Sequence, residues 1–460
     1  MSIKCLREYQ LGSKLGQVRS VPVSLGNDRE KAVLFVYSAQ ENLDPWHECV
    51  YGAKDTLKMA LYTEDGILMW EKDMGEGVIP GVWYFPFISF DLDGDGIDEI
   101  WYVTNLNPNA PFSFIYRRLE RLDPRTGKVT GQWMWPNYTV NETMSHAYRF
   151  FLSGGYVNGS PVLVTAQGTY TDMYLQGYNP GMEKRWEIVI PKDEPGARSS
   201  HLCPVLDFNE DGIDELFWGE RLLSLDDGHE VFCGDREKYR GHSDIVTPFI
   251  DIETGKKYIY TCREGYEVPG EQRVVIYDAQ GQKAWTAVDE GHMHKGWIAN
   301  IGENYRKVIM SMRLDRKFTE TGLSDEAGAV FYFDAVTGKE LKDPIPFPGN
   351  EVMPLDFDGD GYHEFCGIEG DSKGYVFDRF GKILKFIGGE QVRSGKILSE
   401  PGEQIMLFYP HEGKVRVWGD DCAVESDVFR ARYQNGYLEF MQHLMGTGYN
   451  HINGTVSCGI

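Results

Sequence analysis

Short apolar runs alternate with turns rich in Gly, Asp and Pro along almost the whole chain, and helical periodicity is nearly absent. Runs of this length between turn residues predict β-strands. Turns that begin with Asp and end with Gly recur at 65–66, 123–127, 278–281, 334–338 and 378–381. Such turns suit β-hairpins, because Asp accepts backbone N–H groups and Gly adopts positive φ. The pattern therefore predicts an all-β protein.

The strands recur in units of about 40 to 65 residues, close to what four short strands require. A strand that begins a unit is predicted near Val18, Trp83, Ser145, Ser200, Gly241, His294, Glu351 and Val392. We interpret the units as the blades of a β-propeller. Eight blades are expected, and seven are the close alternative because two of the units are short. A single domain over 1–460 is expected, in which 429–460 either cap the propeller or complete a blade.

Three acidic segments lie between apolar runs and repeat one pattern, with oxygen-bearing residues at positions 1, 3, 5 and 9 and Gly at position 6. This is the ligand pattern that a hard cation such as Ca²⁺ requires. The flanking runs predict strands, so we expect structural Ca²⁺ in turns between strands rather than in EF-hands. The expected ligands are Asp91, Asp93, Asp95 and Glu99, then Asp207, Asn209, Asp211 and Glu215, then Asp356, Asp358, Asp360 and Glu364.

The composition narrows the function classes. A formal net charge of −24 argues against a nucleic-acid partner, since phosphate binding needs a basic surface. No apolar run approaches the roughly 18 residues that cross a membrane, so no membrane partner is expected. The eight Cys are scattered, and no secretory leader opens the chain. A cytoplasmic enzyme is expected, although a secreted protein whose leader had been removed would read the same.

In a propeller the first strands of all blades line the axis, and their starts converge at one opening. His residues occupy such starts in consecutive units. A lone His there is more often structural, whereas several placed alike indicate a functional site. His146 is one of them, and the residues expected to bind substrate are His47, Tyr148, Arg149, His292, His294 and Trp297.

Cys and His residues also gather between 201 and 262. Thiolate and imidazole ligands together favour tetrahedral Zn²⁺. The expected ligands are His201, Cys233, His242 and Cys262. Four protein ligands leave no open position, so this Zn²⁺ is expected to be structural, and buried free Cys residues are the alternative. If His201, His242 and His294 held a metal with an open position, a metal-dependent glycan hydrolase would follow.

Several motifs occur along the stretch that runs from Tyr170 to Asp244. They are Gly168-Thr169-Tyr170, His201 six residues before the second acidic segment, Trp218-Gly219-Glu220 and Gly241-His242-Ser243-Asp244. With the acidic repeats, this order resembles the propeller-fold polysaccharide lyases, namely the rhamnogalacturonan and ulvan lyases. The resemblance implies β-elimination at a uronic acid in an anionic oligo- or polysaccharide of rhamnose–uronate type.

This reaction needs a base, an acid and a positive group that neutralises the carboxylate. We expect His146 as the base, because imidazole titrates near neutral pH. Tyr170 or Tyr174 is the expected acid, and Arg198 and Arg263 are expected to bind the carboxylate bidentately. A non-catalytic carbohydrate- or protein-binding propeller is the alternative function. The sequence makes no prediction of the oligomeric state.

Overall fold

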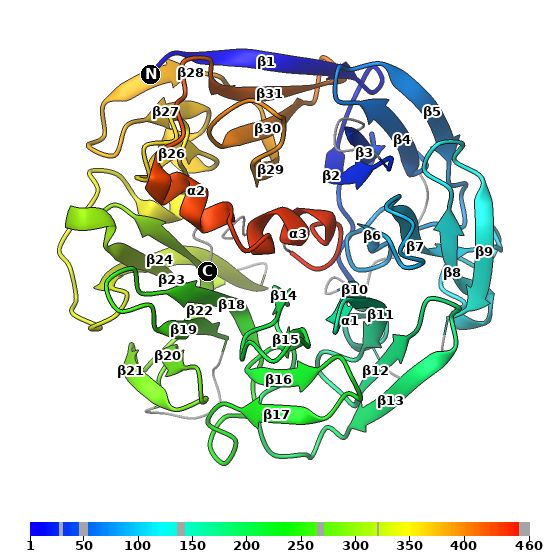
Figure 1. Cartoon of the computed structure of the whole chain (residues 1–460), viewed down its shortest axis with the longest axis horizontal. Helices are drawn as coiled ribbons and strands as arrows, with labels where there is room; N and C mark the ends of the chain where they lie inside the picture. Colours follow the sequence, from blue (N-terminus) through cyan, green and yellow to red (C-terminus); the bar gives the residue numbers. More distant parts are fainter. Residues whose placement is uncertain (27–30, 46–53, 136–142, 265–270, 320–321, 450–460) are drawn as a thin grey trace.

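The computed structural model describes residues 1–26, 31–45, 54–135, 143–264, 271–319 and 322–449. In this part of the chain, eight antiparallel sheets form a ring around a central axis (Figure 1). The fold is an eight-bladed β-propeller. The all-β class and the count of eight blades are confirmed, and the alternative of seven is wrong.

In the first four blades, consecutive strands follow one another from the axis to the rim. Blade 1 contains β2 (Gln17–Ser24), β3 (Lys31–Ser38), β4 (Lys58–Thr63) and β5 (Leu68–Asp73). Blade 2 contains β6 (Phe87–Phe90), β7 (Glu99–Asn105), β8 (Arg117–Leu122) and β9 (Val129–Met134). Blade 3 contains β10 (Phe150–Val157), β11 (Ser160–Gln167), β12 (Met173–Tyr178) and β13 (Lys184–Ile190). Blade 4 contains β14 (Val205–Leu206), β15 (Glu215–Trp218), β16 (Arg221–Ser224) and β17 (Glu230–Cys233).

The remaining blades follow the same order, with three strands in blade 6. Blade 5 contains β18 (Ser243–Ile250), β19 (Lys257–Arg263), β20 (Val274–Asp278) and β21 (Lys283–Ala287). Blade 6 contains β22 (His292–Asn300), β23 (Lys307–Thr319) and β24 (Gly322–Asp334). Blade 7 contains β25 (Val352–Leu355), β26 (Glu364–Gly367), β27 (Tyr375–Phe377) and β28 (Ile383–Phe386). Blade 8 contains β29 (Glu390–Gly395), β30 (Gln404–Tyr409), β31 (Lys414–Asp420) and β1 (Ile3–Gln10).

The ring is closed by the start of the chain. Strand β1 pairs antiparallel with β31 and forms the outermost strand of blade 8, with Ile3 opposite Asp420. The first blade already has four strands of its own. Closure by β1 therefore ties the two ends of the repeat together through backbone hydrogen bonds.

The strands near the axis are more deeply buried than the strands at the rim. Strands β6, β7 and β14 are buried along their whole length, whereas the outer strands β5 and β9 alternate between exposed and half-buried residues. A strand packed on both faces needs a continuous apolar run, and a strand at the rim needs only one apolar face. Each inner strand starts within five residues of its predicted position.

The inner strands give the propeller two distinct ends. The acidic segments directly follow β6, β14 and β25, so they lie at the end where inner strands finish, which we call the acidic-loop end. The histidine segments precede or begin β14, β18 and β22, so they lie at the opposite end, which we call the imidazole end. The same strands therefore separate the two groups of candidate residues.

Helices are few in the described chain. The α-helices are α1 (Met144–Ala147), α2 (Asp427–Tyr433) and α3 (Tyr437–His443), and the 3-10 helices are η2 (Phe114–Tyr116), η3 (Glu303–Tyr305), η4 (Gly349–Glu351) and η5 (Gly370–Ser372). None of these helices has the length and apolar character that a bilayer-spanning helix requires.

Helices α2 and α3 of the C-terminal segment lie across the centre of the ring (Figure 1). The segment starts at the acidic-loop end, where Arg432 pairs with Asp356 at 3.0 Å. Helix α3 then packs against β2 and β6. The segment reaches the imidazole end, where the backbone N–H of Tyr449 donates to the carbonyl of His201 at 3.1 Å. It thus lies across the ring and adds no strand to any described sheet.

Candidate active site

Six side chains from three consecutive blades meet at the imidazole end, and we call them the imidazole cluster. They are His201 before β14, His242 and Asp244 at the start of β18, Glu264 directly after β19, and His292 and His294 at the start of β22. The propeller geometry brings them together because each lies where a strand of its blade reaches this end.

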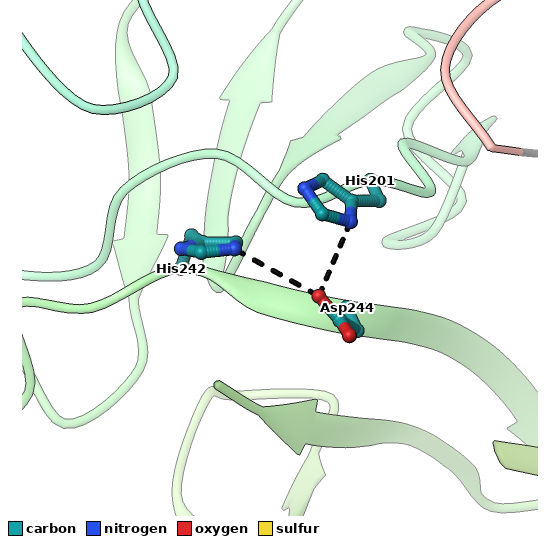
Figure 2. A group of neighbouring side chains, drawn as sticks. All are labelled: His201, His242 and Asp244. Atoms are coloured by element: carbon teal, nitrogen blue, oxygen red, sulfur yellow. Dashed lines mark ion pairs between the residues drawn. The ribbon is translucent and has the colours of Figure 1, made fainter. Parts of the chain in front are cut away.

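Asp244 is the centre of the cluster. Its Oδ1 lies 3.1 Å from Nδ1 of His201 and 3.7 Å from Nε2 of His242 (Figure 2). Its Oδ2 lies 2.7 Å from Nδ1 of His294. The carboxylate is 1% exposed. Burial by itself would raise the pKa of Asp244, but His201 and His294 hold it well below its usual range. Asp244 is therefore ionised among the imidazoles.

Glu264 supplies a second carboxylate. It pairs with Nε2 of His242 and lies 3.2 Å from Nε2 of His292. Burial lowers the pKa values of His201 and His292, whereas Asp244 outweighs burial at His294 and raises its pKa. His201 and His292 thus favour the neutral form, which carries a lone pair for a ligand.

The donor atoms of the cluster fit a divalent cation. The atoms offered by His201, His242 and Asp244 all lie within 4.8 Å of one another, and so do those of Asp244, His292 and His294. Both ring nitrogens of His201 and both carboxylate oxygens of Asp244 are buried, and the ion-pair contacts between them lack the geometry of regular hydrogen bonds. Imidazole nitrogen with carboxylate oxygen is a common ligand set for Zn²⁺ and similar ions.

The two Cys residues predicted as zinc ligands lie elsewhere. Cys233 is on the outermost strand β17, and its thiol donates to the carbonyl of Gly234 at 3.7 Å. Cys262 is buried in β19 and donates to the carbonyl of Lys295 at 3.7 Å. Burial raises the pKa of both thiols, that of Cys233 to about 11. No cluster within the described ranges joins either thiol to His201 and His242. In the structure, Asp244 occupies the place that the sequence assigned to Cys.

An aromatic and cationic group borders the cluster on the side of blade 3. Tyr170 lies in the turn between β11 and β12, with its ring centroid 4.8 Å from that of His242 and 5.6 Å from that of His146. The guanidinium of Arg149 lies 4.9 Å from the Tyr170 ring. Burial raises the pKa of Tyr170 above its usual value, with a smaller opposing effect of Arg149. The phenol therefore keeps its proton at neutral pH.

Residues from distant parts of the chain complete this side. Arg149 also lies over Trp83 at 4.6 Å, and its Nη2 is 3.8 Å from Oδ1 of Asp44. The hydroxyl of Tyr449 donates to Asp44, and the Tyr449 ring lies 4.9 Å from that of His201. The C-terminal segment therefore contributes a side chain to the candidate site.

The two arginines predicted to bind a carboxylate are already engaged. Arg263 is buried and pairs with Glu220 through two nitrogens at 2.6 and 2.8 Å. Arg198 donates to the carbonyls of Pro191 at 3.1 Å and of Thr171. Arg198 thus braces the turn that carries Tyr170, and Arg263 neutralises a buried carboxylate of the protein itself.

Other predicted residues lie outside the cluster. Tyr174 is on β12, the third strand of blade 3, opposite Val189. Trp297 is buried in β22 and donates to the carbonyl of Gly349 at 2.8 Å. Tyr148 is buried against Tyr84. His47 lies outside the described residues. Of the predicted substrate-binding residues, the structure brings Arg149, His292 and His294 to the site.

The acidic segments form compact turns at the opposite end. In the first, Asp91 accepts from the backbone N–H groups of Gly94 at 2.7 Å and Gly96 at 2.8 Å. The oxygens of residues 91, 93 and 95 lie within 4.8 Å of one another, as do those of 356, 358 and 360. In the second segment the Asn209 amide donates to Glu215 at 2.9 Å.

Burial, with nearby carboxylates, raises the pKa values of acids in these turns. The pKa is raised to about 7 for Glu99 and Glu215, about 8 for Asp356 and about 10 for Glu364. Such crowded carboxylates fit a bound cation, and Ca²⁺ remains the prediction for them.

Sequence reasoning missed five residues of the site, which are Asp44, Trp83, Asp244, Glu264 and Tyr449. A signal for Asp244 was present, because it stands two residues after His242 at the start of a strand. No signal pointed to Tyr449, since its place depends on the path of the C-terminal segment.

No protein-family model matches the chain. The chain is similar to two proteins of Bacillus subtilis (strain 168). It is 26% identical over 317 residues to rhamnogalacturonan exolyase YesX, covering 61% of this chain and 50% of YesX. It is 24% identical over 330 residues to rhamnogalacturonan endolyase YesW, covering 57% of this chain and 53% of YesW. The chain thus spans about half the length of the curated relatives it matches.

Solved structures share the fold. The rhamnogalacturonan lyase PL11 of Bacillus licheniformis has a TM-score of 0.75 and 18% identity, covering 95% of this chain and 77% of that chain. The crystal structure of YesX has a TM-score of 0.74 and 17% identity, with the same coverage. The resemblance to propeller-fold polysaccharide lyases that was inferred from the sequence is confirmed, because the similar sequences and structures are rhamnogalacturonan lyases.

Proposed function

We propose that the protein is a polysaccharide lyase that cleaves a glycan of rhamnose–uronate type by β-elimination. The observation that carries this proposal is the position of Tyr170, whose ring lies next to His146, His242 and Arg149 at the imidazole end. The similarity to YesX and YesW, which are named rhamnogalacturonan lyases, supports the same substrate class.

The proposed reaction removes the C5 proton of a uronate and breaks the bond between C4 and its glycosidic oxygen. His146 takes the C5 proton, a C4=C5 double bond forms, and Tyr170 gives its proton to the departing oxygen. The raised pKa of Tyr170 supports the role of acid, since the phenol stays protonated at neutral pH. The ring centroids of His146 and Tyr170 are 5.6 Å apart, so both groups reach one sugar residue.

The uronate carboxylate must be neutralised before C5 releases its proton. Arg149 takes this role in place of Arg198 and Arg263, because its guanidinium faces Tyr170 and is oriented by Asp44. A divalent cation held by His201, His242 and Asp244 would supply further positive charge when bound. The ion pairs of the cluster also keep these side chains in place.

Substitution of Tyr170 by Phe tests the proposal. The Tyr170→Phe variant should lose about 10²–10⁴-fold in turnover of rhamnogalacturonan oligosaccharides, because only the proton donor is removed. Turnover is measured by the ultraviolet absorbance of the unsaturated uronate. Tyr174→Phe is the matched control, since that tyrosine lies on β12 outside the cluster. It should keep wild-type turnover.

Two results would contradict the proposal. Equal activity of Tyr170→Phe and wild type would remove Tyr170 from the mechanism. New reducing ends without the absorbance of an unsaturated product would indicate hydrolysis instead of elimination.

A further inference from the structure

The imidazole cluster contains two sets of possible metal ligands that share one carboxylate, and Asp244 faces the two sets with different oxygens. In the first set, Oδ1 of Asp244 lies 3.1 Å from Nδ1 of His201 and 3.7 Å from Nε2 of His242 (Figure 2). In the second set, Oδ2 of Asp244 lies 2.7 Å from Nδ1 of His294 and 4.0 Å from Nε2 of His292. A carboxylate placed in this way has one oxygen available for each of two cations.

Glu264 repeats this arrangement. Its Oε2 contacts Nε2 of His242 in the first set, and its Oε1 lies 3.2 Å from Nε2 of His292 in the second set. Asp244 and Glu264 therefore each direct one oxygen to each set. Each set then offers two imidazole nitrogens and two carboxylate oxygens, which is the number of ligands that a tetrahedral ion such as Zn²⁺ takes.

The separations between the donor atoms match one ion in each set. Two ligands of a tetrahedral ion with bonds of about 2.0–2.1 Å lie about 3.4 Å apart. The oxygens of Asp244 lie 3.1 to 4.0 Å from the nitrogens of His201, His242 and His292. The contacts of Asp244 with His294 and of Glu264 with His242 are shorter, so these side chains would separate by about 1 Å when ions bind.

The second set is open to solvent on the side of β22. The side chain of His294 is 42% exposed and that of Glu264 is 21% exposed, whereas that of Asp244 is 1% exposed. Ions can therefore enter past His294, while the central carboxylate stays shielded from water. An ion in the second set also has room for a further ligand from solution, as a catalytic metal requires.

We propose that the imidazole cluster binds two divalent transition-metal ions, such as Zn²⁺, about 3.5–4 Å apart, with Asp244 and Glu264 as bridges. The other ligands are His201 and His242 on the first ion and His292 and His294 on the second. Two such ions exceed the two negative charges of the carboxylates, so the centre would attract a uronate carboxylate. That role rests on the proposed function, whereas the binding of the ions rests on the donor geometry alone.

Titration of the metal-free full chain with Co²⁺ in excess Ca²⁺ tests the proposal through the visible absorbance of imidazole-bound Co²⁺. The Ca²⁺ fills oxygen-only sites such as the acidic segments and leaves the imidazoles to Co²⁺. The wild type should bind two equivalents. His201→Ala and His294→Ala should each weaken a different equivalent by more than about 100-fold, the upper range for loss of a mere outer-shell partner. Asp244→Ala should weaken both.

His229→Ala is the matched control. His229 pairs with Asp227 at 2.6 Å on the surface, outside the imidazole cluster, and both side chains are more than half exposed. The variant removes an imidazole that contacts a carboxylate, as His294→Ala does, but it should keep both equivalents of Co²⁺.

A second measurement needs no variant and therefore does not depend on the folding of Asp244→Ala. Electron paramagnetic resonance of the wild type, loaded with two equivalents of Mn²⁺ in excess Ca²⁺, should show the exchange coupling of two ions that share carboxylates. Two uncoupled Mn²⁺ signals would overturn the pair.

The outcomes separate this proposal from the lyase proposal. One equivalent of Co²⁺ in the wild type, or loss of the same equivalent in His201→Ala and His294→Ala, would overturn the pair even if the enzyme eliminates. Two separable equivalents in a protein that forms no unsaturated uronate would support the pair and contradict the lyase mechanism.

Discussion

The two ends of the same inner strands are built in opposite ways. At the acidic-loop end, each acidic turn is shaped by local contacts, since Asp91 accepts from the backbone N–H groups of Gly94 and Gly96 within one turn. Three blades repeat this turn with little change. At the imidazole end, His201, Asp244 and His294 come from three different blades. Local repetition builds and holds blades, whereas unrepeated residues that converge at long range build a site.

The charge balance of the two ends differs as well. At the imidazole end, Asp244 and Glu264 lie among four imidazoles, and both carboxyls have lowered pKa values. At the acidic-loop end, burial raises the pKa values of Glu99, Glu215 and Glu364, and nearby carboxylates add to the shift. The first end is organised by its own ion pairs, while the second needs added positive charge.

The largest effect is expected at the third acidic segment, when the positive charge of Arg432 is removed. Arg432 lies 3.0 Å from Asp356 and 3.3 Å from Glu403, and both carboxylates are buried. Arg432→Ala should lower the free energy of unfolding by about 3–5 kcal/mol, since it leaves buried carboxylates unpaired. Denaturant unfolding measures the loss. Turnover by the folded fraction should stay near wild type if this end serves stability alone.

Arg430→Ala is the control on the same helix. Arg430 pairs with Asp427 on the surface, where ion pairs contribute at most about 1 kcal/mol. Equal destabilisation by the two substitutions would show that the loss reflects helix α2 itself rather than the buried pair.

A smaller effect is expected from chelation, which should make the stability of the protein depend on pH. The folded-state pKa of Glu99 and Glu215 is about 7, above the ordinary value of 4.5, so the metal-free native state binds more protons than the unfolded state between these values. Stability should therefore fall as pH rises from about 5 to 8, on the order of 2 kcal/mol. Saturating Ca²⁺ should remove this dependence of the free energy of unfolding on pH. Urea unfolding at the two pH values, with EDTA or with Ca²⁺, measures it, and identical slopes would argue against cations in these turns.

The same contrast explains what sequence predicted and what it missed. The acidic turns, the eight blades and the starts of the inner strands were predictable, because each depends on residues close in sequence. His201 and His242 were predictable as neighbours once the ring was assumed. Cys233 was misplaced because the strand on which it lies is at the rim. Asp44 and Tyr449 had no local signal, since only the folded chain brings them to Arg149 and His201.

The smallest effect is expected at Tyr449, whose C-terminal segment contacts both the acidic-loop end and the imidazole end of the propeller. Its hydroxyl donates to Asp44, which orients Arg149 beside Tyr170. Tyr449→Phe removes one hydrogen bond, so turnover of rhamnogalacturonan oligosaccharides should fall about tenfold, with KM less affected, and the unfolding midpoint should change little. Steady-state kinetics beside thermal unfolding measures both. A stability loss as large as that of Arg432→Ala, with kcat unchanged, would mean that the C-terminal segment stabilises the fold at both ends and contributes nothing to the chemistry at the imidazole end.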